Sequence, residues 1–173
     1  RANGLRYEKV VPERKWKVEY DGDMMTEDGG ERKKVHVSLR LDFEALHQVF
    51  NYRNCVSEED IRLSEKTASE HTEQYGRLTG RLMVGGTEHR IDALGERDHS
   101  WGVRDWIAPT MWIWLTAQFS DGLAMNLTKL FVEEGVVDAG YLHMDGKNLP
   151  IVKADVRTEH APDGSPTAHA RRR

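Results

Sequence analysis

Hydrophobic and polar residues alternate with a period of two along much of this chain. The clearest case is VHVSLRLDF at 35–43, which places Val35, Val37 and Leu39 at every second position and polar residues between them. Successive side chains of an extended strand point to opposite faces of a sheet. The pattern therefore predicts a half-buried strand with one apolar and one polar face.

Similar apolar runs recur about every ten residues and are separated by glycine-containing turns. The runs EQYGRLTGRLMV and TEHRIDALGERDHSWG flank Gly85 and Gly86, and together they predict a long hairpin. Further turns are predicted at DGD (21–23), DG (121–122), EEG (133–135) and DG (145–146). At least seven strands follow, and the fold class is all-β: an antiparallel meander that forms a barrel or a strongly twisted sheet.

Two segments differ from this pattern. Residues 44–69 are predicted to form a long, partly helical connection that covers one end of the sheet as a lid, with DFEALHQVF (42–50) as a short helix. The segment NLPIVKADVRTEH (148–160) is predicted as one more strand, and a polar tail follows at 157–173. The chain begins at Arg1, which indicates a fragment of a longer protein.

Composition narrows the classes of function. The chain has 25 Lys and Arg against 29 Asp and Glu, a net charge of −4, and no sustained basic stripe, so nucleic acid is not a predicted partner. One cysteine, Cys55, excludes an internal disulfide framework and a cysteine-based zinc site. No stretch reaches the roughly 20 apolar residues of a membrane helix. Localisation is open, with the cytoplasm favoured because the chain has one cysteine.

The stretch ERDHSWGVRDW (96–106) concentrates the candidate chemistry. If it is extended, Arg97, His99 and Trp101 share one face and Asp98 and Ser100 share the other, with a bend at a glycine. A histidine beside an aspartate is an acid–base pair, and Glu73 lies on the neighbouring strand of the hairpin. We therefore predict three catalytic residues, Asp98, His99 and Glu73.

An alternative interpretation is structural. Buried charges need partners, so the arginines and aspartates of this stretch could form an ion-pair cluster that stacks on tryptophan and closes the barrel. A metal site would need three ligands, and the available residues, His71, Glu73, His89 and His99, have neither HxH nor HExxH spacing. No metal and no cofactor are predicted.

The aromatic strand TMWIWLTAQF (110–119) places Trp112 and Trp114 on one face and is apolar on both, which predicts a central strand. Such rings are core residues or line a pocket for an apolar ligand. Nine residues are predicted to contact a ligand: Arg97, Trp101, Arg104, Asp105, Trp106, Trp112, Trp114, Gln74 and His71.

These motifs resemble an uncharacterised bacterial family with a lipocalin-like fold, which is distantly similar to the carotenoid hydratases (hydroxyneurosporene synthases) and to AttH-like proteins. The shared pattern is Glu-Gln before a glycine-containing strand, then Arg-Asp-His-Ser-Trp-Gly and Arg-Asp-Trp. The matching positions are Glu73, Gln74, Gly76, Arg97 to Gly102 and Arg104 to Trp106. The resemblance covers roughly residues 4–156.

The resemblance implies a lipocalin-like, incomplete β-barrel over residues 1–156, which is the later part of the first domain of a tandem pair, with the start of the second domain near its end. The predicted partners are therefore a second lipocalin-like domain of the same chain and a hydrophobic small molecule. The functional hypothesis is a domain that binds an apolar molecule, with hydratase- or cyclase-like activity on an isoprenoid or similar substrate. The alternative is a non-catalytic carrier or structural domain in which the Arg-Asp-His-Ser-Trp-Gly motif is a buried ion-pair cluster.

Overall fold

The computed structural model describes most of the chain, in the ranges 3–28, 30–54, 56–67, 69–119 and 121–157. The predicted tail beyond Arg157 and the isolated Cys55 lie outside these residues. Regular structure is almost all antiparallel β, which confirms the predicted all-β class. Within the described residues, no helix has the length and apolar character needed to cross a membrane.

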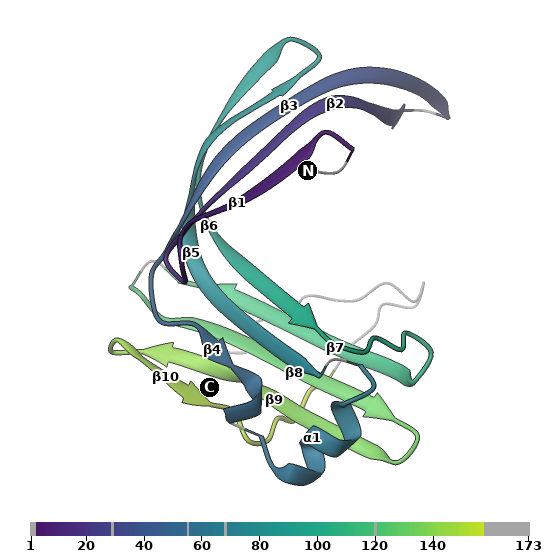
Figure 1. The fold of residues 1–173 in the computed structure, drawn as a ribbon, viewed down its shortest axis with the longest axis vertical. Helices are drawn as coiled ribbons and strands as arrows, with labels where there is room; N and C mark the ends of the chain where they lie inside the picture. The colour runs from purple at the N-terminus through teal and green to yellow at the C-terminus, as the bar shows by residue number, and fades with distance from the viewer. Residues whose placement is uncertain (1–2, 29, 55, 68, 120, 158–173) are drawn as a thin grey trace.

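The first sheet is a long, curved meander (Figure 1). Its strands are β1 (Leu5–Val11), β2 (Lys15–Asp28), β3 (Glu31–Ala45), β5 (Glu70–Val84) and β6 (Thr87–Trp101), and the short β4 (Phe50–Asn51) pairs with β5 beyond the end of β3. The strands β5 and β6 form the predicted hairpin around Gly85 and Gly86, and they stay paired without a register shift from Val84 and Thr87 to Glu70 and Trp101.

The second sheet contains β7 (Pro109–Gln118), β8 (Ala124–Val132), β9 (Gly135–Met144) and β10 (Lys147–Pro150), in the order β10-β9-β8-β7. It lies across the lower half of the first sheet, while the upper ends of β2, β3, β5 and β6 arch away from it (Figure 1). A side chain of the second sheet reaches the backbone of the first, where Gln118 Nε2 donates to the carbonyl oxygen of Gly95 at 2.9 Å. Among the described residues no strand of one sheet pairs with a strand of the other, so the barrel is not closed, as the resemblance implies.

Three local predictions are wrong. The segment DGD at 21–23 is not a turn, because β2 continues through it and pairs with β3 along its whole length. The segment 42–50 is not a helix, because β3 extends to Ala45 and Leu46 N then donates to the carbonyl oxygen of Tyr75. In the C-terminal segment, strand structure ends at Pro150 rather than running on through Arg157.

The connection between β4 and β5 holds a 3-10 turn (Tyr52–Asn54) and the one helix among the described residues, α1 (Glu58–Ser64). The helix begins with a capping box, in which the Ser57 side chain accepts from Asp60 N and the Asp60 side chain accepts from Ser57 N. The helix contacts β8 and β9 and lies at the lower edge of the molecule (Figure 1).

The main hydrophobic core lies between the lower half of the first sheet and the second sheet. Its buried members come from β4, the 3-10 turn, β5, β8 and β9: Phe50, Tyr52, Tyr75, Ala124, Leu130, Val137, Ala139 and Tyr141. In a second buried cluster, the rings of Trp16 and Phe43 pack edge to face, with their centroids 5.5 Å apart. Because Phe43 also contacts Gly76, this cluster lies on the face of β5 opposite Tyr75.

Candidate functional site

A cavity of about 250 Å³ lies between the two sheets and is bordered by α1. One side of it is aromatic and apolar, with Trp106, Trp112 and Trp114 as its largest side chains. The other side carries the polar groups His71, Glu73, Asp98 and Ser100 from β5 and β6. An apolar wall that faces a few converging polar groups is the usual composition of a small-molecule site.

The register of the hairpin brings the polar groups together. In the pairing of β5 with β6, His71 lies opposite Ser100 and Glu73 lies opposite Asp98. Residues two apart on a strand share a face, so all four side chains point to the same side of the sheet. The face that the sequence predicts for Asp98 and Ser100 is thus the face that lines the cavity.

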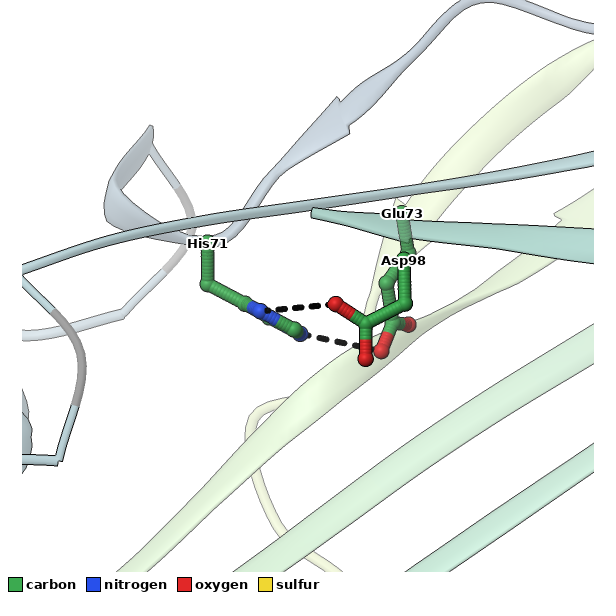
Figure 2. A group of neighbouring side chains, drawn as sticks. All are labelled: His71, Glu73 and Asp98. Carbon is green, nitrogen blue, oxygen red and sulfur yellow. Dashed lines mark hydrogen bonds and ion pairs between the residues drawn. The ribbon is translucent and has the colours of Figure 1, made fainter. Parts of the chain in front are cut away.

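The imidazole of His71 lies at the centre of this group. Its Nδ1 is 2.6 Å from Ser100 Oγ, and its Nε2 is 2.9 Å from Glu73 Oε1. Asp98 approaches Nδ1 as well, with Oδ1 at 3.6 Å, so the ring lies between two carboxylates (Figure 2). Each nitrogen of the ring therefore has its own polar neighbour, which fixes the orientation of the ring.

Glu73 is 1 % exposed and is held from a second direction. Its Oε2 lies 2.8 Å from the hydroxyl of Tyr52, which is also 2.6 Å from Oδ1 of Asn126 on the opposite sheet. Asn126 Nδ2 in turn donates to Glu96 Oε1 at 2.7 Å, and Thr116 Oγ1 donates to Glu96 Oε2 at 2.6 Å. A continuous chain of hydrogen bonds therefore runs from Ser100 to Glu96 through the interior.

All the hydrogen bonds of this chain can form together only if one of its two glutamates, Glu73 or Glu96, is protonated. Burial raises the pKa of Tyr52 well above its usual value, so its hydroxyl keeps its proton, yet it faces two acceptors. Either Glu73 carries a proton and donates it to Tyr52, or the Asn126 amide is turned over and Glu96 carries the proton. In both arrangements Glu73 and Glu96 share one proton.

Glu96 is the glutamate whose environment favours the protonated form. Burial is the largest cause and, with the negative charge of Glu73, it raises the pKa of Glu96 to about 7, while the hydrogen bond from Thr116 works in the opposite direction. With the proton on Glu96, the turned Asn126 amide donates to Tyr52 and Tyr52 donates to Glu73. Glu73 is then an ionised acceptor for His71.

The side chains of His71, Glu73 and Asp98 offer three donor atoms within 4.8 Å of one another, so they are the candidate ligands of a metal ion. The two carboxylates, however, approach opposite nitrogens of the ring (Figure 2). One ion can bind only one of these nitrogens, so it would have to replace one of the two contacts and turn the ring. The arrangement fits a hydrogen-bonded acid–base group better than a metal centre.

Seven of the twelve residues predicted for catalysis or ligand contact line the cavity: His71, Glu73, Asp98, Arg104, Trp106, Trp112 and Trp114. The predicted acid–base partner His99 belongs to the other face of β6, where its ring lies 4.7 Å from that of Trp101. On that same face Arg97 stacks over Trp16, with its guanidinium 4.6 Å from the ring centroid.

The two remaining predicted residues support the fold around the site. The amide of Gln74, on the outer face of β5, donates to the carbonyl oxygens of Glu13 and His47 at 2.9 and 2.7 Å. Asp105 Oδ1 accepts from Ile107 N at 2.9 Å and so shapes the loop before β7. Within the described residues, the arginines and aspartates of the motif contact other groups rather than one another.

The aromatic strand lies elsewhere in its sheet than predicted. Trp112 and Trp114 share the cavity face as expected, but β7 is an edge strand with β8 as its neighbour. The prediction of a central strand is wrong because the sheets do not close: β6, the next strand before β7, pairs with β5 alone among the described residues. The two rings are accordingly 47 % and 46 % exposed.

Sequence reasoning missed four residues of the hydrogen-bonded chain: Ser100, Tyr52, Asn126 and Glu96. A signal for Ser100 was present, because a two-residue turn at Gly85 and Gly86 fixes every cross-strand pair of the hairpin, including His71 with Ser100. No comparable signal locates Tyr52 or Asn126, which reach the site from a 3-10 turn and from the other sheet.

Comparisons with known proteins give a family but no described activity. Neither the curated proteins nor the solved structures contain a match to this sequence. A family model described as Domain of unknown function (DUF7064) matches residues 1–172. This match covers nearly the whole sequence, including every residue of the hydrogen-bonded chain, and it confirms the expectation of an uncharacterised domain family. The chain therefore belongs to the DUF7064 family.

Proposed function

We propose that this domain binds an apolar small molecule in the cavity between its sheets, and that the groups on the polar side of the cavity perform acid–base chemistry on it. The observation that carries the proposal is the composition of the cavity: tryptophan rings on one side, and the His71–Glu73 pair on the other. Rings of this size supply much of the binding energy of an apolar ligand, while the polar groups orient it.

The reaction suggested by the resemblance to carotenoid hydratases is the addition of water to a carbon–carbon double bond. An acid on the polar side of the cavity would protonate the alkene, and the tryptophan rings would stabilise the resulting cation. In this proposal the proton comes from Glu73, which lines the cavity and shares one proton with the buried Glu96, and Asp98 keeps its predicted catalytic role beside it. His99 is not part of the proposal, because it lies on the other face of β6.

The binding step is tested with N-phenyl-1-naphthylamine, an uncharged apolar fluorophore that brightens when it leaves water. We expect Trp114→Ala to raise its Kd about tenfold, which corresponds to roughly 1.4 kcal/mol of lost ring contact. The matched control is Leu115→Ala, the next residue on β7, which faces away from the cavity and is similarly exposed. Equal binding by both variants would place the ligand elsewhere and reject the proposal.

The chemical step is tested by incubation with isoprenoid alkenes and a search for products heavier by one water molecule. His71→Gln and Glu73→Gln should abolish such a product, and His99→Gln should retain it. The non-catalytic alternative, a carrier domain, predicts that the fluorophore binds normally while no substrate is consumed.

A further inference from the structure

We propose that Ser100 is a nucleophile and that the cavity performs acyl transfer on a small ester with an apolar acyl group. In this proposal His71 is the general base and Glu73 is a positioning residue. The inference rests on the proposed binding site but names a different reaction and a residue that the motif analysis did not select.

The geometry is that of a serine–histidine–acid group. Ser100 Oγ lies 2.6 Å from one ring nitrogen of His71, and Glu73 lies 2.9 Å from the other. Such groups occur on unrelated folds and are recognised by these contacts, not by the order of the residues in the chain. All three side chains line the same cavity.

The direction of the protons suits this role. Glu73 accepts from Tyr52 on one oxygen, and as a carboxylate it accepts from His71 Nε2 on the other. The proton of the neutral imidazole is then on Nε2, which leaves the lone pair of Nδ1 directed at the hydroxyl of Ser100. Asp98 Oδ1, 3.6 Å from Nδ1, would stabilise the imidazolium that forms when Ser100 gives up its proton.

A cation is available for the developing oxyanion. Arg104 lines the cavity and stacks over Trp106, with its guanidinium 4.4 Å from the ring centroid. Its Nε is buried and has no hydrogen-bond partner among the described residues. The other arginine of the cavity, Arg53, is engaged by Glu70 at 3.0 Å. A buried donor without a partner is costly, and a substrate oxygen would satisfy it.

The reaction balances as follows. Ser100 Oγ bonds to the carbonyl carbon of the ester as its proton moves to His71 Nδ1, and negative charge collects on the carbonyl oxygen. The carbon–oxygen bond to the alcohol then breaks, and the alcohol leaves with the proton from His71. Water attacks the acyl-Ser100 intermediate with the same base, which releases a carboxylic acid and restores the serine hydroxyl.

The dimensions of the cavity restrict the substrate. Its volume of about 250 Å³ is below the roughly 300–1,000 Å³ of sites for drug-sized ligands. The structure therefore favours esters of short or medium aliphatic acids, whose acyl chains would lie against Trp112 and Trp114.

The test uses a fluorophosphonate with a medium alkyl chain, which transfers its phosphonyl group to an activated serine and releases fluoride. We expect stoichiometric labelling by intact mass, with the modification mapped to Ser100 by peptide mass spectrometry. Ser100→Ala should remove the label, and His71→Gln should slow labelling at least 100-fold. His99→Gln, from the other face of β6, should label at the wild-type rate.

The positioning role of Glu73 has its own readout. In Glu73→Gln the imidazolium loses its carboxylate partner, so the pH at which labelling is half-maximal should fall. A merely structural defect would lower the labelled fraction without moving this pH. Thermal melts of each variant confirm that the compared proteins are folded.

The proposal of ligand binding and the proposal of a nucleophilic serine can fail separately. If the fluorophore binds in the cavity but Ser100 is not labelled, or if the label maps to another residue, the acyl-transfer proposal is overturned and the binding proposal stands. If neither the fluorophore nor the phosphonate acts on the wild-type protein, both proposals fail. Loss of labelling in His99→Gln would also overturn the assigned roles.

Discussion

The hydroxyl of Tyr52 and the side-chain amide of Asn126, 74 positions apart in the chain, lie 2.6 Å from each other and join the two sheets inside the core. Tyr52 also reaches Glu73 on the first sheet, and Asn126 belongs to β8 of the second. The contact therefore couples the packing of the sheets to the orientation of the groups that line the cavity.

Removal of the Tyr52 hydroxyl should destabilise the protein. In Tyr52→Phe, the buried oxygens of Glu73 and Asn126 lose a partner, and we expect a loss of about 1–3 kcal/mol in the free energy of unfolding. Urea unfolding followed by circular dichroism measures it. The control is Tyr20→Phe, whose hydroxyl makes a long surface contact of 3.4 Å to the Asp23 carbonyl. Similar losses in the two variants would contradict the bridging role of Tyr52.

The Glu96 carboxyl should make stability depend on pH. Its folded-state pKa is raised to about 7 from its usual value of about 4.5, chiefly by burial. The folded protein therefore holds a proton that the unfolded chain has lost across this window, so the stabilisation is complete below about pH 4.5 and disappears as pH rises through about 7.

Replacement by glutamine removes this dependence. The stability of Glu96→Gln relative to wild type should increase by about 1–2 kcal/mol between about pH 5 and pH 8, a range discounted for the partial exposure of the group. Urea midpoints at several pH values measure it. Glu88→Gln, an exposed position on the same strand, should give a difference that stays flat with pH. A flat difference for Glu96→Gln too would mean that its carboxyl does not hold the shared proton.

Gly140 fixes the approach of β9 to β8 beside the site. A Cβ at this position would overlap the backbone carbonyl oxygen of Asn126 and lie 2.9 Å from Cα of Leu127, and its φ of 137° is unfavourable for other residues. We expect Gly140→Ala to cost about 2–4 kcal/mol in thermal or urea unfolding. Gly86→Ala has positive φ but open space, so it should cost only about 1 kcal/mol. Equal losses of stability in the two variants would show that β8 can shift to make room for the added methyl group.

Arg97 should contribute to stability and not to ligand binding. Its guanidinium covers the ring of Trp16, which is 2 % exposed, so Arg97→Ala should lose about 1–2 kcal/mol of unfolding free energy. Binding of the fluorophore should stay at the wild-type level, because this contact lies on the face of β6 away from the cavity. Arg90→Ala, whose side chain is 93 % exposed, should change neither quantity. Weaker binding by Arg97→Ala would restore its predicted place among the ligand contacts.

The alternation of polar and apolar residues is enough to divide the motif into two faces. It places Asp98 and Ser100 together and Arg97, His99 and Trp101 opposite them, and the structure has this division. Alternation cannot decide which of the two faces borders a cavity, because both contain polar groups and aromatic or buried neighbours. That choice depended on where the second sheet packs, and it placed His71, and not His99, beside the cavity.

Turn prediction failed at DGD (21–23), which lies inside β2. Continuous pairing of β2 with β3 from Lys15 to Asp28 explains this, since a turn at Gly22 would break the ladder halfway. A local turn signal does not reveal how long the partner strand is, and here the partner strand keeps Gly22 extended.

The sequence by itself determined the all-β class, the β5–β6 hairpin and its register, because the two-residue period and a glycine pair act over a few neighbouring residues. It also determined that His71 faces Ser100, since the turn fixes that pair. Only the tertiary structure decided that Tyr52 and Asn126 complete the site, that β7 is an edge and that the tryptophans face the polar groups across a cavity. These relationships depend on how the two sheets pack on each other, and that packing is set by the summed burial of residues far apart in the chain.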